Sequence, residues 1–219
     1  MRGTTARDTV PTMITPVRRI TLASASPRRK DLLAQIGIDA IVAPSHADED
    51  SVSLARLREN GEPAESAPAQ LALRRASLKA ETAQRRPGTI GLLAADTVVT
   101  IDNDSLEKPR DAADARAMLG RLSGREHSVH TAVVFVPKHG EPVQNICTTA
   151  VTFLALTDTE IEAYVATGEW QGVAGAYRIQ GRGGAYVTAI RGSYTAVVGL
   201  PIATVYSIIR RFLDGDPRS

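Results

Sequence analysis

The chain has 219 residues, of which 43% are hydrophobic and 23% are charged, so it can bury a substantial core and is ordinary in composition. Its 26 basic and 24 acidic residues leave a net charge of +2, and 4% of the residues are aromatic. DNA- and RNA-binding proteins are usually more basic and offer stacking rings, so no nucleic-acid partner is expected. Apolar runs are too short to span a membrane, and the N-terminus lacks a signal peptide's apolar core.

The first half of the chain predicts short strands and helices. Residues 1–17 show no periodicity and are expected to be a flexible extension. Residues 20–23 predict a strand, Pro27 suits the first position of a helix, and Gly37 suits its C-terminal cap. A strand is expected over residues 38–43, a long polar loop over 44–69 and a helix over 68–83. A long loop inside a compact domain is often functional.

Residues 89–101 are the most informative stretch. They predict a buried strand, because apolar residues continue on both sides of Asp96 and Thr97. An ionised carboxylate within an apolar strand is costly unless it is paired or binds a metal. We therefore expect Asp96 to face a cleft and to take part in chemistry.

The second half of the chain predicts a hairpin and three helices. Asp102-Asn103-Asp104 is expected to be a turn, and Asp111 the N-cap of a helix that ends at Leu122. Alternating apolar residues predict paired strands over 129–135 and 143–156. Helices are expected over 158–165 and 201–213, on either side of a glycine-rich segment over 168–199. Cys147, the only cysteine, excludes an internal disulfide, fits a reducing compartment and is expected in the core. The sum is an α/β fold with parallel and antiparallel strands.

The segment Ser24-Ala25-Ser26-Pro27-Arg28-Arg29 joins the first strand to the first helix. A strand that leads into a helix N-terminus is a natural anion site, and two hydroxyls with two guanidiniums could hold phosphates there. The same residues also fit a serine N-cap followed by solvated arginines. The residues alone leave these two interpretations open.

Other candidate site residues are charged or polar and lie in separate elements. Asp48-Glu49-Asp50 is either a solvated acidic loop or, with Asp96, an oxygen-ligand site for Mg²⁺, which commonly binds one or two carboxylates plus substrate phosphates. Lys79 and Lys108 are either solvated or, if both reach the Asp96 cleft, able to offset phosphate charge. Gln180 can donate and accept hydrogen bonds at once, as the edge of a base requires, unless its segment is only a tight turn.

Three other chemistries are not supported. The four histidines share no metal-ligand spacing, and the chain has no Gly-Lys-Ser/Thr phosphate loop. Asp102 and Asp104 suggest the nucleophile motif of haloacid-dehalogenase phosphatases, but Leu106 stands where that motif needs Thr or Val.

Taken in order, several segments resemble the Maf family of nucleoside triphosphate pyrophosphatases over about residues 19–213. Each motif is weak alone, whereas the ordered set is specific. The matching stretches are Leu22 to Arg29, Asp48-Glu49, Leu78-Lys79-Ala80, Ala95-Asp96-Thr97-Val98-Val99, Lys108-Pro109, Leu122-Ser123-Gly124 with His127, Ala174-Gly175-Ala176-Tyr177 with Ile179-Gln180-Gly181, Gly192-Ser193-Tyr194 and Gly199-Leu200-Pro201.

The resemblance implies hydrolysis of a nucleoside triphosphate to a monophosphate and pyrophosphate, with Mg²⁺ or Mn²⁺, in the cytoplasm and as a homodimer. It implies an elongated mixed sheet flanked by helices, with two lobes around an active-site cleft, as in the Maf and inosine triphosphatase folds. The catalytic domain would span 18–214, followed by a tail over 215–219. The Ala-Gly-Ala-Tyr and Ile-Gln-Gly segments are similar to the dTTP/UTP-preferring branch, with modified pyrimidine triphosphates as further candidates.

The resemblance also assigns roles by motif position. Asp96 would be the proton acceptor and would share the metal ion with Glu49. The remaining catalytic residues would be Lys79 and Lys108. The substrate-binding and specificity residues would be Ser24, Arg28, Arg29, Thr97 and Gln180.

The chain departs from the family pattern in two places. Gly172-Val173 stands where the family often has Asp-Lys, and residues 50–69 look longer than usual. A missing phosphate-contacting lysine would change affinity or metal dependence, and a longer loop would alter access. An alternative from another class is therefore a nucleotide-binding regulator of cell division or septum formation with little catalysis. The acid pair and both lysines favour the enzyme.

Overall fold

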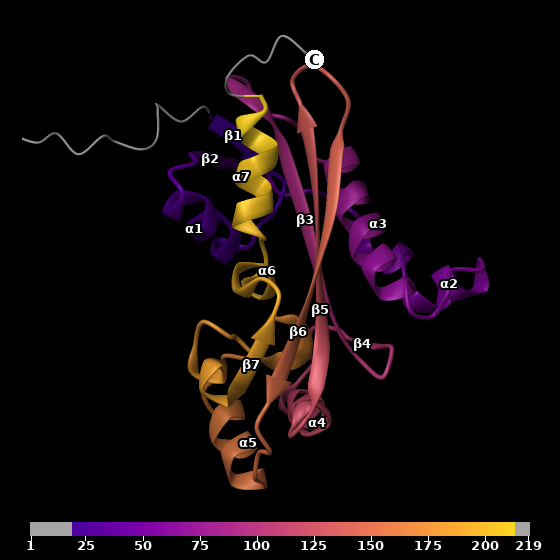
Figure 1. Cartoon of the computed structure of the whole chain (residues 1–219), viewed down its shortest axis with the longest axis vertical. Helices are drawn as coiled ribbons and strands as arrows, with labels where there is room; N and C mark the ends of the chain where they lie inside the picture. Colours follow the sequence, from indigo (N-terminus) through magenta and orange to yellow (C-terminus); the bar gives the residue numbers. More distant parts are fainter. Residues whose placement is uncertain (1–18, 213–219) are drawn as a thin grey trace, which may run out of the picture.

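A long mixed sheet organises the computed structural model, which describes residues 19–212. The strand order is β2-β1-β3-β5-β6-β7, and β4 pairs with the end of β3, on the same edge as β1 (Figure 1). Neighbours β2, β1 and β3 run parallel, whereas β3, β5, β6 and β7 run antiparallel, so the predicted mixture of strand senses is confirmed. The strands are β1 (Arg19–Leu22), β2 (Ala40–Val42), β3 (Thr89–Ile101), β4 (Asp104–Leu106), β5 (Glu126–Pro137), β6 (Val143–Phe153) and β7 (Val187–Arg191).

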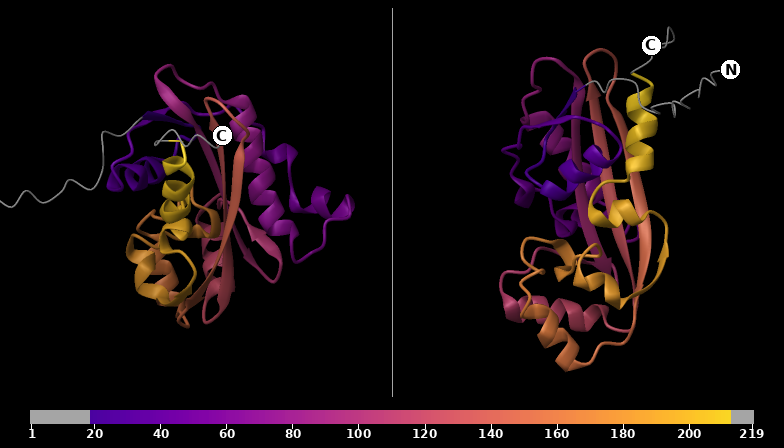
Figure 2. Two further views of the ribbon diagram at one scale, coloured as in Figure 1. Left: turned by 45° about the horizontal axis from the view of Figure 1, so that its top comes forward. Right: turned by 90° about the vertical axis from the view of Figure 1, so that its left-hand side faces the viewer.

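Helices cover both faces of this sheet, which explains why β3 is apolar along nearly its whole length. The helices are α1 (Pro27–Gln35), α2 (Leu54–Glu59), α3 (Ala67–Thr82), α4 (Ala112–Leu122), α5 (Asp158–Val165), α6 (Tyr194–Val198) and α7 (Ile202–Arg210). Figures 1 and 2 show α3 on one face and α1, α6 and α7 on the other. Leu93 and Val99 of β3 join the larger core on the α1 and α7 side, whereas Val98 packs beneath α3.

Local sequence signals account for most element ends. Pro27 occupies the first turn of α1, and Gly37 follows that helix with a φ of 71°. The Asp111 side chain accepts a hydrogen bond from the backbone N–H of Asp114, which caps α4 as predicted. Asp102 and Asn103 have φ values of 53° and 63°, and they form the predicted turn between β3 and β4.

The sheet leaves one stretch of β3 unpaired on its β1 side. Pairing with β1 ends at Leu93, and pairing with β4 begins only at Val99. Asp96 and Thr97 lie between these points, where β5 alone pairs with the strand. Successive strand residues point to opposite faces, so Asp96 points towards α3 and Thr97 towards α1 and α6. An opening at this edge can therefore receive side chains from both faces of the sheet.

The sequence-based prediction was wrong or incomplete in four places. Residues 44–69 are not a continuous loop: they hold a 3-10 turn, η1 (Glu49–Ser51), and α2, whose first residue Leu54 is buried against the core beneath α3. The short α6 and the edge strand β7 were not predicted. The glycine-rich segment forms two 3-10 turns, η2 (Ala174–Ala176) and η3 (Arg182–Tyr186), rather than one tight turn.

The fourth correction concerns Cys147, which is half-buried rather than in the core. β7 pairs only with the later part of β6, from Ala150 onward, so Cys147 lies where β6 has no outer partner. The extension predicted over 1–17, the tail over 215–219 and Leu213 lie outside the described residues. Between residues 19 and 212, no helix is both long and apolar enough to cross a membrane.

Candidate active site

A cavity of about 1060 Å³ opens at the unpaired stretch of β3. This is enough room for a nucleotide-sized ligand, since ligand pockets usually measure about 300–1,000 Å³. The cavity is lined by residues from the β1–α1 loop, η1, α3, β3, the β4–α4 loop and the glycine-rich segment. It brings together every residue that the resemblance assigned to the site: Ser24, Arg28, Arg29, Glu49, Lys79, Asp96, Thr97, Lys108 and Gln180. Their chemical roles stay predictions.

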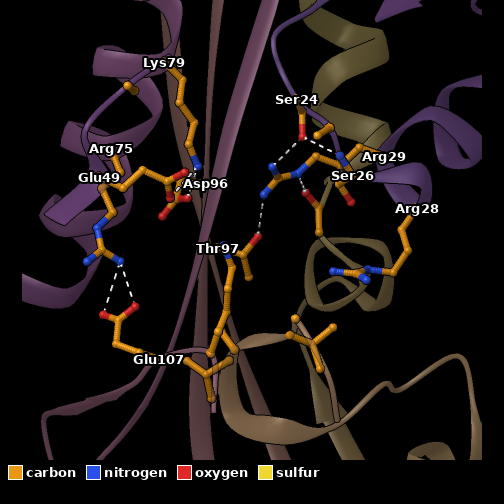
Figure 3. Close-up of a pocket in the computed structure, with 18 of the residues that line it drawn as sticks. Ser24, Ser26, Arg28, Arg29, Glu49, Arg75, Lys79, Asp96, Thr97 and Glu107 are labelled. Carbon is orange, nitrogen blue, oxygen red and sulfur yellow. Dashed lines mark hydrogen bonds and ion pairs between the residues drawn. The ribbon is translucent and has the colours of Figure 1, made fainter. Parts of the chain in front are cut away.

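On the α3 side of the strand, Lys79 joins two carboxylates. Its Nζ atom donates to Oδ1 of Asp96 at 2.6 Å and lies 2.9 Å from Oε2 of Glu49 (Figure 3). Lys79 and Asp96 are buried, whereas the Glu49 side chain is 36% exposed. The carboxylate in the apolar strand is therefore paired with an ammonium group, as a buried charge requires.

The pKa of Glu49 reflects these neighbours. Burial by itself would raise this pKa, but the charge and hydrogen bond of Lys79, together with the charges of Lys108 and Arg75, outweigh burial and lower it. The carboxylate of Glu49 is thus held in its ionised form by the cations around the cavity.

On the other side of the strand, the Arg29 guanidinium connects three segments. Its Nε donates to the carbonyl oxygen of Gly199 at 2.9 Å, Nη1 to Oγ of Ser24 at 3.1 Å, and Nη2 to Oγ1 of Thr97 at 3.3 Å. Arg29 is buried, and burial lowers its pKa against the opposing charges of Asp96 and Glu49. A solvated arginine is therefore the wrong interpretation at this position.

Arg28, Lys108 and Gln180 line the cavity in more open positions. Arg28 is half-buried, and its pKa is lowered by burial and by the like charges of Arg178 and Arg29. Lys108 and Gln180 are exposed. Burial and clustering of guanidiniums raise the free energy of the empty site, and an anion bound between them would relieve that repulsion.

Gly175 holds the segment that carries Gln180 against β3. Its φ is 72°, and a Cβ atom at this position would lie 2.9 Å from Cγ1 of Val99. Two residues later, the buried Tyr177 hydroxyl is 2.9 Å from Nε2 of His127. Burial lowers the pKa of His127 to about 4, so the imidazole is neutral at pH 7. His127 therefore packs behind the cavity wall as a neutral side chain and does not line the cavity.

Sequence reasoning missed Arg75 and Glu107, which also line the cavity. Arg75 donates from Nη1 to Oε1 and Oε2 of Glu107, at 3.2 and 3.0 Å. The i, i+4 spacing of Arg75 and Lys79 on one helix was the signal that could have placed both in the same cavity.

The charges lining the cavity are balanced. Its basic residues are Arg28, Arg29, Arg75, Lys79 and Lys108, and its acidic residues are Asp48, Glu49, Asp50, Asp96 and Glu107. A triphosphate alone would meet as many carboxylates as cations. A triphosphate that arrives with a divalent cation would find partners for both charges.

The carboxylates of the cavity fit such a cation only if the phosphates of the bound ligand supply further oxygen atoms. Within residues 19–212, no three His, Cys, Asp or Glu side chains are grouped as a metal site. Mg²⁺ needs only one or two carboxylates when substrate phosphates supply other oxygens. Oδ2 of Asp96 is buried and has no hydrogen-bond partner among the described residues, so it is an acceptor that a cation or water could satisfy.

The fold and cavity define a mixed α/β protein with a large cavity at an open strand edge, lined by charged side chains of both signs. The chain belongs to the Maf family, because the family model described as Maf-like protein matches residues 19–212. It is 47% identical over 195 residues to a dTTP/UTP pyrophosphatase of Syntrophotalea carbinolica, covering 88% of this chain and 84% of that protein. It is 45% identical to a dTTP/UTP pyrophosphatase of Gluconobacter oxydans, covering 91% and 89%.

A solved structure of a HAM1 protein from Coxiella burnetii is similar at 20% identity and a TM-score of 0.32, covering 60% of this chain and 70% of that one. That likeness is too low to bear on function.

Proposed function

We propose that this protein is a nucleoside triphosphate pyrophosphatase that hydrolyses dTTP and UTP to the monophosphate and pyrophosphate. The observation that carries the proposal is the Glu49–Lys79–Asp96 cluster at the open edge of β3, opposite the buried Arg29 and its loop. The family relationship and the names of the relatives support it.

Asp96 acts as the general base in the proposed reaction. Its carboxylate takes a proton from a water molecule, whose oxygen attacks the α-phosphorus in line with the leaving group. The α-phosphorus to bridging-oxygen bond breaks, pyrophosphate leaves with that bond's electron pair, and the proton passes from Asp96 to solvent. Lys79 and Lys108, with Arg28 and Arg29, stabilise the charge that develops on the phosphate oxygens.

Lys79 has a second role in this proposal. In the ligand-free site its ammonium occupies Oδ1 of Asp96 and keeps that oxygen from an attacking water. A bound triphosphate competes for the ammonium and frees the carboxylate for the attacking water. Asp96 and Glu49 would hold a divalent cation, Mg²⁺ or Mn²⁺, which when bound supplies positive charge against the triphosphate.

The pyrimidine preference is assigned to Arg28, Thr97 and Gln180. Uracil and thymine present an N–H donor between two carbonyl acceptors, and the Gln180 amide can match such an edge because it donates and accepts. Thr97 is held in place by the Arg29 guanidinium and by the Thr131 hydroxyl, 3.1 Å away. 5-Methyl-UTP and pseudo-UTP present the same edge, whereas 5-methyl-CTP presents an amino donor beside an N3 acceptor, so all three belong in the substrate panel.

The test is pyrophosphate release from each triphosphate, with Mg²⁺ or Mn²⁺, by the unaltered protein and by Asp96→Asn. We expect dTTP and UTP to be the preferred substrates, and Asp96→Asn to lower kcat about 10²- to 10⁴-fold without unfolding the protein. Asp102→Asn, in the exposed turn after β3, is the matched control and should keep full activity. Near-normal turnover by Asp96→Asn would remove Asp96 from the proposed role.

The same panel separates the enzyme from the regulator. Gly172 and Val173 line the cavity where the family often has a lysine, which is the feature that favours the regulator. Tight triphosphate binding without pyrophosphate release would identify a nucleotide-binding regulator. A homodimer and a cytoplasmic location are the parts of the proposal that rest on the family resemblance alone, and analytical ultracentrifugation tests the first.

A further inference from the structure

A buried arginine ties together two loops that carry proposed site residues. Arg75 lies on α3, one turn before Lys79, and its side chain is 10% exposed. Its Nε donates to the carbonyl oxygen of Val52 at 3.3 Å, and its Nη1 donates to both oxygens of Glu107. Figure 3 shows the Arg75 side chain extending from its helix to the carboxylate of Glu107.

Each of these contacts lies next to a proposed site residue. The backbone N–H of Val52 donates to the carbonyl of Glu49, which closes the η1 turn, so a hydrogen bond to Val52 bears directly on the turn that holds Glu49. Glu107 immediately precedes Lys108. One guanidinium therefore links the backbone around Glu49 to the backbone around Lys108.

The chemistry of the guanidinium suits this task. Its donors diverge in a rigid planar fork, so it can serve a carbonyl and a carboxylate at the same time. A lysine at this position would present one nitrogen and could not hold both partners in the same geometry. Other side-chain contacts of the η1 turn are the Lys79–Glu49 ion pair, the hydrogen bond from the Ser51 hydroxyl to the Asp48 carbonyl, and the exposed contact of Arg56 with the Ser51 carbonyl. Exposed tethers of this kind restrain a loop weakly.

We propose that Arg75 is a positioning residue that sets the separation of Glu49 and Lys108 across the cavity without touching the substrate. This inference rests on the proposed function, which assigns Glu49 and Lys108 to the site. Arg75 would thus act on the phosphate and cation end of the ligand through two loops at once. If Arg75 only filled the core, its replacement would lower the stability of the whole protein and leave the two loops as ordered as they are in the unaltered protein.

The test compares Arg75→Lys and Arg75→Met with Arg74→Met, an exposed neighbour on the same helix. We expect both Arg75 variants to lose about 10- to 100-fold in kcat/KM for dTTP, as is typical when a supporting hydrogen bond is removed, and Arg74→Met to stay within twofold of the unaltered protein. Glu107→Gln should lose less, because its amide oxygen still accepts one hydrogen bond from Arg75.

Hydrogen exchange is the second readout, and it does not depend on turnover. In Arg75→Lys, amides in 49–53 and 106–110 should exchange faster, while amides in the middle of β3 and β5 keep their protection. Unchanged exchange in either loop, or equal acceleration throughout the protein, would overturn the positioning role. If the unaltered protein released no pyrophosphate, the proposed function would fail, and the exchange result would still decide whether Arg75 orders both loops.

Discussion

Replacing Lys79 with methionine should expose how costly the Asp96 carboxylate is. Methionine keeps the length and apolar body of lysine but removes the ammonium that contacts both Asp96 and Glu49. Glu49 is partly exposed and can turn to water. Asp96 is 5% exposed and is fixed within β3, so it cannot.

The expected loss of stability follows from that asymmetry. Removing one partner of a buried ion pair typically costs about 3–5 kcal/mol of stability. In Lys79→Met most of this cost comes from the Asp96 carboxylate, which is left buried and unpaired. Asp96→Asn should cost less, about 1–2 kcal/mol, because Lys79 keeps Glu49 and can still donate to the amide oxygen. In the double variant no charge is left buried and unpaired. Its loss should therefore fall short of the summed single losses by about 2 kcal/mol or more.

The assay is urea denaturation at pH 7.5, monitored by circular dichroism, of the unaltered protein, Lys79→Met, Asp96→Asn and the double variant. The slope of the unfolding free energy against urea concentration is compared between them. A common slope shows that the same surface unfolds in each. A loss below about 1 kcal/mol in Lys79→Met, or single losses that add to within about 0.5 kcal/mol, would refute the reasoning, because it requires a strongly coupled buried pair.

Two further predictions concern the wall of the cavity. The pKa of His127 is about 4 in the folded protein against 6.5 for an ordinary histidine, so the unfolded chain binds the proton first and stability falls as the pH drops from about 6.5 to 4. His127 should contribute about 2 kcal/mol to the loss at pH 5 relative to pH 7.5, and His130, whose pKa burial also lowers, should add to that loss. In acid denaturation titrations His127→Gln should remove the His127 contribution, whereas His139→Gln, at an exposed position, should retain it. Gly175→Ala should destabilise by about 2–3 kcal/mol through its positive φ and its contact with Val99, whereas Gly172→Ala, with a φ of 68° and open space around its Cβ position, should cost about 1 kcal/mol. Equal losses at the two glycines in urea melts would contradict the packing argument.

The family relationship bears on which of these residues are particular to this chain. Asp96, Lys79 and Lys108 fall within the stretches that resemble the Maf family, so the proposed chemistry is shared with relatives. Arg75 and the residues at 172–173 lie outside those stretches. Arg75 is proposed to act through two loops without touching the nucleotide, whereas residues 172–173 line the cavity itself.

The sequence by itself determined the strands and helices that have strong local signals. Proline at the start of α1, the Asp111 cap of α4 and the apolar run of β3 act within a few residues, and each appeared where it was expected. α2 and α6 escaped prediction because helices of six and five residues hold too few apolar positions to show a period. The sequence also marked Asp96 as anomalous, since the cost of a carboxylate in an apolar strand does not depend on the fold.

Only the tertiary structure decided what resolves that cost. The partner of Asp96 is Lys79, 17 residues earlier on a helix that packs across the strand, and the gap between β1 and β4 is what opens the edge of β3 to a ligand. In sequence, Arg29 and Arg75 look like the more open arginines beside them, the half-buried Arg28 and the exposed Arg74, yet each is buried and joins separate segments. Ion pairs and tethers of this kind link residues distant in the chain, so local periodicity holds no record of them.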